Sequence, residues 1–442
     1  MRLCRRLLAT SRRLELFKSN VRPSEHVTSC IGCGWQLQSE NPKQLGFVPA
    51  PKEAPVLLDP LDPRHDEAQS ERCLCQRCWR IRNNRDIVLE APDQATKLRT
   101  LKNRVGVVVL IADLADVEGS LPSHFAREVS GANPVVLVGN KRDLLPEGAT
   151  EYRLRTWLMR RAEERALHPT SVHVVSSKLG TGVMELVKDV ANRSNLFKKD
   201  VFLCGRTNVG KSSLLNKMIR MYGGPPHLKT TVSPLHGTTV GLIPVPMGHG
   251  GNRNMYDTPG LLGTDRIHSL LSRAEQKIVT PHTQIKSKVF RLIPGKCLLL
   301  GDFGRIDYLE GCGHLLFATF VSSRLTNLVK ATSIDKPPVA RLEPVAFEFD
   351  GDDVSHSWNS AWTDIVFPGV GWVSVTGRAP GGRIRLVAHA LKEVTPPVAR
   401  EPLMPLEAAA TELKRVERPV VKHGSVTRFQ ARRPKPTEKT HA

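Results

Sequence analysis

Short, unbroken apolar runs alternate with helical stretches from about residue 104 onward. Runs without polar alternation are typical of strands that are buried on both faces of a sheet. The expected strands are VGVVVLIAD (105–113), PVVLVGN (134–140), VHVVSS (172–177) and DVFLCG (200–205), and the expected helices are 151–167 and 211–220. Buried strands that alternate with helices predict an α/β fold with a doubly wound, mostly parallel sheet.

The pattern differs on both sides of this region. Residues 34–72 form a Pro-rich loop between two groups of cysteines. From about 285 to 400, short apolar runs are split by Gly, Pro and Asp, which predicts a β-rich domain. After about 400 the chain becomes rich in Lys, Arg and Pro, so we expect order to fade there.

Composition adds a strong charge imbalance. Lys and Arg number 64 against 43 acidic residues, so the formal net charge is +21. Such an excess indicates a polyanionic partner, either nucleic acid or an anionic membrane surface. No apolar stretch reaches the ~18 residues that a membrane span needs, so we expect no integral membrane protein. A hydrophobic content of 40% excludes a wholly disordered chain.

The N-terminus is basic and amphipathic. In MRLCRRLLATSRRLELF (1–17), five arginines precede the first acidic residue, Glu15. An Arg-rich, acid-poor start without a long apolar core is typical of an organellar transit peptide, with the mitochondrion favoured over the plastid. A basic RNA-binding arm is the alternative.

A phosphate-binding motif follows the strand at 200–205. Residues 205–212 have the sequence GRTNVGKS, which is G-x-x-x-x-G-K-S between a predicted strand and a helix. The backbone N–H groups of such a loop surround phosphates, Lys211 reaches the β- and γ-phosphates, and Ser212 holds Mg²⁺. The candidate residues are Gly205, Arg206, Thr207, Asn208, Val209, Gly210, Lys211, Ser212 and Ser213.

Two further motifs complete the phosphate side. MYDTPG (255–260) follows a Gly-rich, hairpin-like stretch, and Asp257 at a strand end suits a magnesium role, directly or through water. The N–H of Gly260 is expected to sense the γ-phosphate. Between the motifs lies HGTT (236–239), in which we expect Thr239 to complete the Mg²⁺ shell, with Thr238 as the alternative.

A base-binding motif ends the strand at 134–140. Asn140, Lys141, Arg142 and Asp143 form N-K-x-D, in which an Asp carboxylate accepts from both N1–H and the amino group of guanine. The stem of Lys141 is expected to lie over the ring. Ser176, Ser177 and Lys178 end the next strand, where a backbone N–H meets guanine O6.

The order of these motifs is permuted. In an ordinary GTPase the phosphate motifs come first, whereas here NKRD (140–143) and SSK (176–178) precede the phosphate loop at 205–212. The sheet still forms, because strands only need to meet in space and domain termini often lie close together. The segment after DTPG then leads directly into the C-terminal domain, so we expect hydrolysis to move that domain.

The chain resembles the YqeH-type circularly permuted GTPases, whose organellar members include the nitric-oxide-associated protein 1 family. Besides the permuted order, the resemblance rests on C-x-G-C (30–33), C-x-R-C (75–78), LLLGDFGRIDYLEG (298–311), FATFVSSRLTN (317–327), DIVFPGVGWVSV (364–375) and PLMPLE (402–407). It implies GTP hydrolysis and assembly of the small ribosomal subunit in an organelle. No haem or flavin fingerprint supports a nitric oxide synthase.

Some residues depart from the family pattern. Ser177 stands where Ala is usual, and Asp302 stands where a second Gly is common. Leu261 occupies the position of the water-orienting Gln of Ras-like enzymes. Asn208 matches the residue that coordinates potassium in some relatives. The resemblance therefore implies slow intrinsic hydrolysis, stimulated by K⁺ and by a ribosomal partner.

The cysteines indicate a metal site. Cys30 and Cys33, with Cys75 and Cys78, form two C-x-x-C knuckles, and four thiolates satisfy a structural, tetrahedral Zn²⁺. Cys73 is an additional cysteine that can replace Cys75 as a zinc ligand, and His65 is a weaker candidate ligand. A redox C-x-x-C pair and unrelated free thiols are the alternatives. Neighbouring Trp and Arg residues favour RNA contact, although the Trp residues are also typical of a core.

The sequence thus predicts five segments: a transit peptide or linker (1–28), a Cys₄ zinc-finger module (29–88), a permuted GTPase domain (89–284), a β-rich, RNA- or ribosome-binding domain (285–405) and a disordered basic tail (406–442). The favoured function is a GTP-controlled assembly factor that binds rRNA and proteins of the mitochondrial small subunit. The alternatives are a non-hydrolysing, GTP-stabilised RNA scaffold and a membrane-associated GTPase. We expect no DNA partner and no stable membrane insertion.

Overall fold

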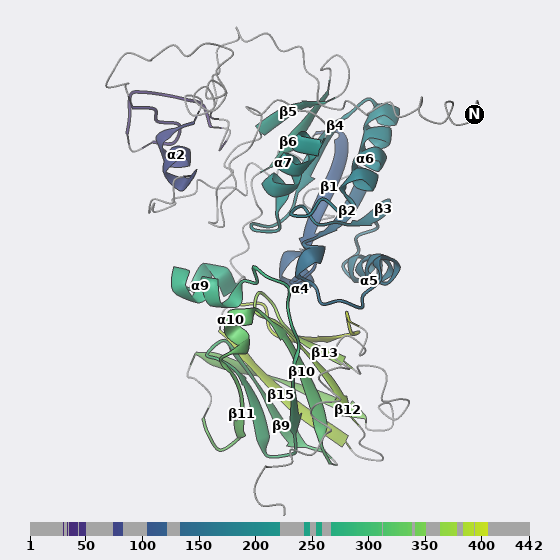
Figure 1. Cartoon of the computed structure of the whole chain (residues 1–442), viewed down its shortest axis with the longest axis vertical. Helices are drawn as coiled ribbons and strands as arrows, with labels where there is room; N and C mark the ends of the chain where they lie inside the picture. The colour runs from purple at the N-terminus through teal and green to yellow at the C-terminus, as the bar shows by residue number, and fades with distance from the viewer. Residues whose placement is uncertain are drawn as a thin grey trace, which may run out of the picture.

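The structure is a computed structural model. It describes residues 30, 33, 35–42, 44–49, 74–82, 104–121, 133–221, 243–247, 253–258, 267–311, 313–337, 341–350, 363–377, 383–392 and 394–404. Within these residues an α/β domain lies above a β-rich C-terminal domain in the view of Figure 1, and a small Cys-containing segment bears the short helix α2 (Gln76–Arg82).

The α/β domain is built on one six-stranded sheet with the order β3-β2-β1-β4-β6-β5. All neighbouring pairs are parallel except β5 with β6, which form an antiparallel hairpin. The strands are β1 (Gly106–Asp113), β2 (Val135–Asn140), β3 (Ser171–Val174), β4 (Asp200–Cys204), β5 (Ile243–Met247) and β6 (Arg253–Asp257). The predicted doubly wound sheet is confirmed.

Helices cover both faces of this sheet, which explains the unbroken apolar runs. Val108 and Leu110 of β1 share a core cluster with Leu154 and Trp157, whereas the alternate residue Val109 packs in the cluster on the opposite face. The helices are α4 (Val117–Ser120), α5 (Glu151–Glu163), α6 (Val183–Phe197) and α7 (Lys211–Met221), with a 3-10 turn η2 (Arg142–Leu144). The predicted helix at 151–167 ends earlier, because residues 164–166 form a turn.

The strand order of the sheet reflects the permuted order of the motifs in the chain. β4, which precedes the phosphate loop, lies beside β1 in the middle of the sheet, although β2 and β3 come between them in the chain. β5 forms one edge of the sheet, and Pro244 and Pro246 lie in it opposite Tyr256 and Asn254 of β6. The phosphate and base halves of the domain are therefore joined at the centre of one continuous sheet.

Two short helices, α8 (Ile267–Leu270) and α9 (Arg273–Val279), lead into the C-terminal domain. α9 begins with a capping box, in which the Ser272 side chain and Glu275 each bond the other's backbone N–H. This local signal, S-x-x-E, explains why the helix starts at this point.

The C-terminal domain consists of two five-stranded antiparallel sheets, with the orders β16-β13-β14-β10-β7 and β11-β8-β9-β15-β12. Its elements are β7 (Lys288–Leu292), β8 (Lys296–Leu300), β9 (Gly304–Glu310), β10 (Leu315–Val321), α10 (Ser323–Thr326), β11 (Val329–Ser333), β12 (Leu342–Asp350), β13 (Thr363–Phe367), β14 (Gly371–Gly377), β15 (Arg383–Leu391) and β16 (Val398–Arg400). The β-rich prediction is confirmed. The turn at Asp302 forms normally, since Phe303 N–H donates to Leu300 O at 3.2 Å.

One apolar core crosses from the α/β domain into the C-terminal domain. Phe320 and Trp372 stack with ring centroids 5.0 Å apart and share a buried cluster with Trp157 and Leu403. The N–H of Leu403 donates to Asp364 at 2.9 Å, and its carbonyl accepts from Arg153 of α5 at 3.4 Å. The two domains are therefore packed together rather than merely linked.

A leucine comparison tests this shared core. Leu403→Ala removes a fully buried side chain at the interface and is expected to lower the free energy of unfolding by about 3 kcal/mol. Leu196→Ala, at an exposed position of α6, is the control and should cost below about 0.5 kcal/mol. Urea unfolding followed by tryptophan fluorescence measures both. Equal effects would contradict the shared core.

Candidate nucleotide site and metal centre

The predicted motifs meet at one edge of the sheet. The phosphate loop follows β4, the DTPG segment follows β6, and the two base motifs follow β2 and β3. These four strands run parallel, so their carboxyl ends lie on the same side. Ligands of open parallel sheets bind at this edge, next to the point where the strand order reverses.

Asn140 joins the base half to the phosphate half. Its Nδ2 donates to the carbonyl of Val209 in the phosphate loop at 2.9 Å. The same Nδ2 donates to Ser177 Oγ at 3.3 Å, and its Oδ1 accepts from Ser177 N–H at 3.0 Å. Asn140 is completely buried. One side chain therefore holds three of the predicted motifs together.

The phosphate loop needs glycine where it meets this side chain. Gly210 has a φ of +94°, and a Cβ there would lie 2.4 Å from Asn140 Nδ2. Asn208 also takes a left-handed conformation, with a φ of 62°. Lys211 is 6% exposed, and its Nζ donates to the carbonyls of Gly205 at 3.1 Å and Arg206 at 2.9 Å. These bonds hold the ammonium group inside the loop.

The magnesium candidates Ser212 and Asp257 are in contact. Ser212 Oγ donates to Asp257 Oδ2 at 2.7 Å, across the gap between α7 and the end of β6. A hydroxyl and a buried carboxylate are hard oxygen ligands, so the pair fits Mg²⁺. Ser213 is half-buried in the first turn of α7. Thr238, Thr239, Gly260 and Leu261 lie outside the described residues.

The base motif is held by hydrogen bonds from the SSK segment. Ser176 Oγ donates to Asp143 Oδ1 at 2.6 Å and accepts from Leu179 N–H at 3.0 Å. Lys141 has a φ of 64°, and its Nζ lies 2.7 Å from Asp113 Oδ2. Lys178 is exposed. The Asp143 carboxylate is thus oriented by a hydroxyl from the neighbouring strand end.

Sequence reasoning missed Asp113. It closes the predicted strand 105–113 and pairs with Lys141. A carboxylate at the last position of a central, otherwise apolar strand was the available signal, because the edge of the sheet is where polar groups meet a ligand.

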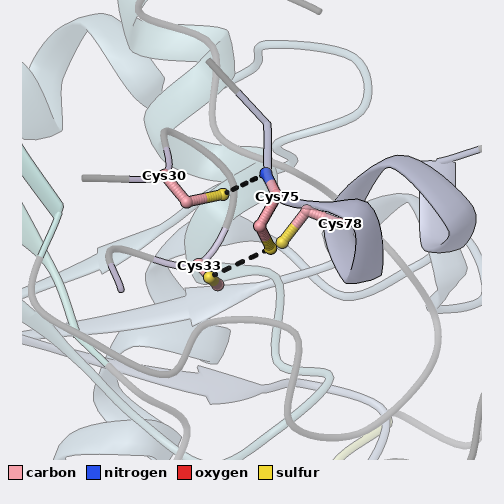
Figure 2. A group of neighbouring side chains, drawn as sticks. All are labelled: Cys30, Cys33, Cys75 and Cys78. Carbon is pink, nitrogen blue, oxygen red and sulfur yellow. Dashed lines mark hydrogen bonds between the residues drawn. The ribbon is translucent and has the colours of Figure 1, made fainter. Parts of the chain in front are cut away.

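The four knuckle cysteines come together in a buried cluster (Figure 2). All four Sγ atoms lie within 4.8 Å of one another, and those of Cys33 and Cys75 are 3.8 Å apart. Ligands at ~2.3 Å from a tetrahedral Zn²⁺ are separated by about 3.8 Å, so the cluster fits a zinc ion. The Cys75 N–H donates to Cys30 Sγ at 3.2 Å, a bond that orients a metal ligand.

The crowding changes thiol acidity. Hydrogen bonds from Cys33, Cys75 and Cys78 lower the pKa of Cys30, whereas hydrogen bonds from Cys30, Cys33 and Cys75 raise the pKa of Cys78. Four thiolates within 4.8 Å of one another would repel, and a divalent cation would offset their charge. The alternative ligands Cys73 and His65 lie outside the described residues.

The sheet, the phosphate loop and the N-K-x-D motif at one edge define a P-loop GTPase with a circularly permuted order. Residues 200–292 match the family model described as "50S ribosome-binding GTPase". YqeH of Bacillus subtilis is 32% identical over 359 residues, which cover 78% of this chain and 92% of YqeH. The chain therefore belongs to the YqeH-type family of circularly permuted GTPases, and it hydrolyses GTP as an enzyme of that class.

Nitric-oxide-associated proteins are also similar to this chain. Nitric oxide-associated protein 1 of Homo sapiens is 24% identical over 538 residues, covering 85% of this chain and 75% of the human protein. "NO-associated protein 1, chloroplastic/mitochondrial" of Arabidopsis thaliana is 26% identical over 330 residues, covering 66% of this chain and 57% of that protein. Among the described residues, no helix is long and apolar enough to cross a membrane.

Metal analysis tests the cysteine cluster. We expect about one zinc per chain in the purified protein, and loss of that zinc in the Cys33→Ser/Cys78→Ser double variant. Cys297→Ala is the control, because Cys297 is equally buried but belongs to β8 of the C-terminal domain. Zinc that persists in the double variant would contradict this assignment.

Proposed function

We propose that this GTPase is a nucleotide-controlled assembly factor for the small ribosomal subunit of an organelle, the mitochondrion in the first instance. The observation that carries the nucleotide part is the Asn140 side chain, which joins base motif and phosphate loop. A ribosomal partner is supported by the description of the matched family model and by the net charge of +21. The name of the Arabidopsis relative and the basic segment 1–17 support an organellar location.

We propose the following roles on the phosphate side. The N–H groups of 205–210 surround the phosphates, and Lys211 turns from the loop carbonyls to the β- and γ-phosphates. Ser212 and Asp257 hold Mg²⁺, which supplies charge neutralisation of the phosphate oxygens. Thr239 completes this shell in the triphosphate state, and Gly260 senses the γ-phosphate.

On the base side, Asp143 accepts both hydrogen bonds from the guanine edge, and Ser176 orients its carboxylate. The stem of Lys141 covers the ring. The Ser177 N–H already donates to Asn140, so we assign the contact with guanine O6 to the Lys178 N–H. Adenine lacks the N1–H and amino pair, which accounts for guanine selectivity.

The partner on the ribosome is a separate question from the nucleotide. The matched family model names the 50S subunit, whereas the resemblance to YqeH-type proteins implies the small subunit. We propose the small subunit, bound through rRNA and proteins by the C-terminal domain, the zinc module and the basic tail at 406–442. The Asn208 side chain is proposed to bind K⁺, as in potassium-stimulated relatives.

A base-specificity swap tests the guanine pocket. Asp143→Asn turns an acceptor oxygen into a donor amide, which matches xanthosine, so we expect a preference for xanthosine over guanosine nucleotides by at least about tenfold. Nucleotide affinities measured by equilibrium titration decide this. Asp189→Asn is the control, because Asp189 pairs with Arg193 of α6 and not with a base motif. Unchanged guanosine preference would refute the role of Asp143.

Turnover with ribosomal subunits tests the partner. We expect single-turnover GTP hydrolysis to rise at least about tenfold with isolated mitochondrial small subunits and to need K⁺ rather than Na⁺. Large subunits are the matched control and should have little effect. Stimulation by large subunits alone would overturn the small-subunit assignment, and equal rates in Na⁺ would overturn the potassium assignment. Absence of hydrolysis with every partner would favour the GTP-stabilised scaffold.

A further inference from the structure

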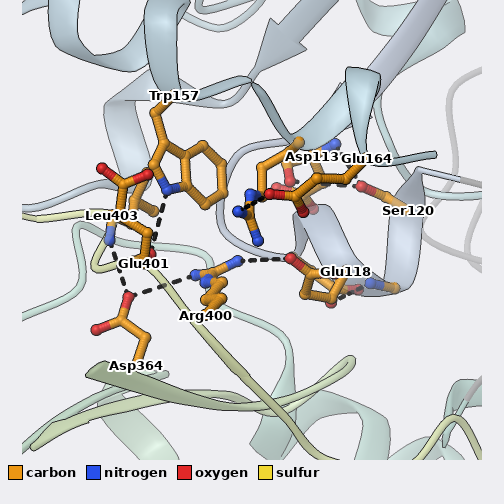
Figure 3. A network of polar contacts seen from close by, with 12 residues as sticks. Asp113, Glu118, Ser120, Trp157, Glu164, Asp364, Arg400, Glu401 and Leu403 are labelled. Carbon is orange, nitrogen blue, oxygen red and sulfur yellow. Dashed lines mark hydrogen bonds and ion pairs between the residues drawn. The ribbon is translucent and has the colours of Figure 1, made fainter. Parts of the chain in front are cut away.

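The turn after β1 contacts both the base motif and the C-terminal domain. It carries three carboxylates: Asp113 at the end of β1, Asp116 before α4, and Glu118 within α4. Figure 3 shows Asp113 and Glu118 in one polar network with Arg400 and Asp364 of the C-terminal domain. Asp113 pairs with Lys141 of the base motif, whereas Asp116 and Glu118 bond residues of the C-terminal domain.

Asp113 fixes the ammonium group of Lys141. Its Oδ2 lies 2.7 Å from Lys141 Nζ, and its Oδ1 accepts from Ala115 N–H at 3.0 Å. Because both oxygens have partners, the carboxylate has a fixed orientation. A charge-assisted bond at this distance holds the Lys141 stem in one direction. That stem is the part of Lys141 proposed to cover the guanine ring.

The turn itself is closed into a rigid unit. The Asp113 N–H donates to Ser120 Oγ at 2.9 Å, which links the first and last residues of the turn. Asp116 Oδ1 accepts from Gly119 N–H at 3.1 Å and caps α4. A displacement of α4 therefore also displaces the Asp113 carboxylate.

Two bonds tie this unit to the C-terminal domain. Asp116 Oδ1 accepts from the N–H of Gly369, in the turn between β13 and β14, at 2.9 Å. Glu118 pairs with Arg165, which follows α5, and with Arg400 of β16 at 3.4 Å. The α/β domain thus presents carboxylates to the C-terminal domain at two separate points.

Arg400 is held firmly in this interface. Its side chain is 3% exposed and lies 3.7 Å from Asp364. Its guanidinium lies over the rings of Trp157, 4.8 Å away, and Trp372, 5.9 Å away, one from each domain. Removing one partner of such a buried network leaves a charge uncompensated, so separating Arg400 from Glu118 and Asp364 is costly.

The phosphate loop borders the same interface. A cavity between the domains is lined by Asp113, Asp116 and Asn208 on one side and by Ser322 and Gly369 on the other. The segment before β7 also bonds the residue that follows the base motif, since Ile285 N–H donates to Leu144 O at 2.8 Å. The C-terminal domain therefore docks against the base half of the nucleotide site.

We propose that the turn 113–120 couples the C-terminal domain to the guanine site, with Asp113 as a positioning residue for Lys141. A partner that displaces the C-terminal domain moves Asp116 and Glu118, and hence Asp113, and changes the rate at which guanine nucleotide leaves. By reciprocity, bound nucleotide changes the affinity for that partner by the same factor as the partner changes the equilibrium affinity for nucleotide. This inference rests on the proposed base-binding role of Lys141.

Nucleotide dissociation from the full chain tests the coupling. The probe is N-methylanthraniloyl-GDP, displaced by excess GDP. We expect the Asp113→Asn variant to release the probe about tenfold faster than wild type, and the Glu118→Gln variant about threefold faster. In steady-state assays the KM for GTP should rise, whereas kcat should stay unchanged. Because Glu118 acts through Asp113, the double variant should release the probe no faster than Asp113→Asn alone.

Controls separate coupling from simple loss of stability. Asp116→Ala breaks the bond to Gly369 and is the second variant if Glu118→Gln fails to fold; it should also speed release. The control variant Asp189→Asn, at a carboxylate paired with Arg193, should leave probe release unchanged. The coupling would be overturned if the variants at 116 and 118 lower the urea midpoint but leave probe release unchanged. It would also be overturned if the rate increases of Asp113→Asn and Glu118→Gln multiply in the double variant.

The Lys141→Ala variant separates the positioning role of Asp113 from the base-binding role of Lys141. If it speeds release and Asp113→Asn does not, the positioning role of Asp113 is wrong and the base site stands. If Lys141→Ala leaves probe release unchanged, the proposed role of Lys141 in base binding is wrong, and the coupling fails with it. If the wild-type chain binds no probe at all, the proposed guanine site itself is wrong.

Discussion

The nucleotide site depends on one buried amide. Asn140 offers two donors and one acceptor, and it uses them on the carbonyl of Val209 and on Ser177. Leaving these groups unpaired in the interior would be costly, so the contact fixes the relative position of the loops after β2, β3 and β4. Asn140 and Val209 are 69 positions apart in the chain, so this contact joins loops that are distant in sequence.

The same contact explains the glycine at 210. The space that a Cβ would take there is filled by the Asn140 amide. At position 210 the loop has no room for a side chain, and its left-handed backbone there favours glycine. The sequence pattern of the phosphate loop is thus set partly by its neighbour and not only by the ligand.

Much of the fold was predictable because its signals are local. Continuous apolar runs indicated β1, β2, β3 and β4, and short motifs located the loops after them. The contacts of Asp113 and Arg400 were not predictable, since they join residues far apart in the chain and nothing near them marks a partner. The docking of the C-terminal domain was missed for that reason, and the five segment boundaries, the transit peptide and the basic tail stay predictions.

The edge formed by β5 has a consequence for association. Pro244 and Pro246 lack the N–H that a pairing strand requires, and β5 is bonded to β6 on its other side. The hairpin therefore closes this side of the sheet against strand addition. A blunted sheet margin of this kind limits edge-to-edge aggregation between copies of the chain.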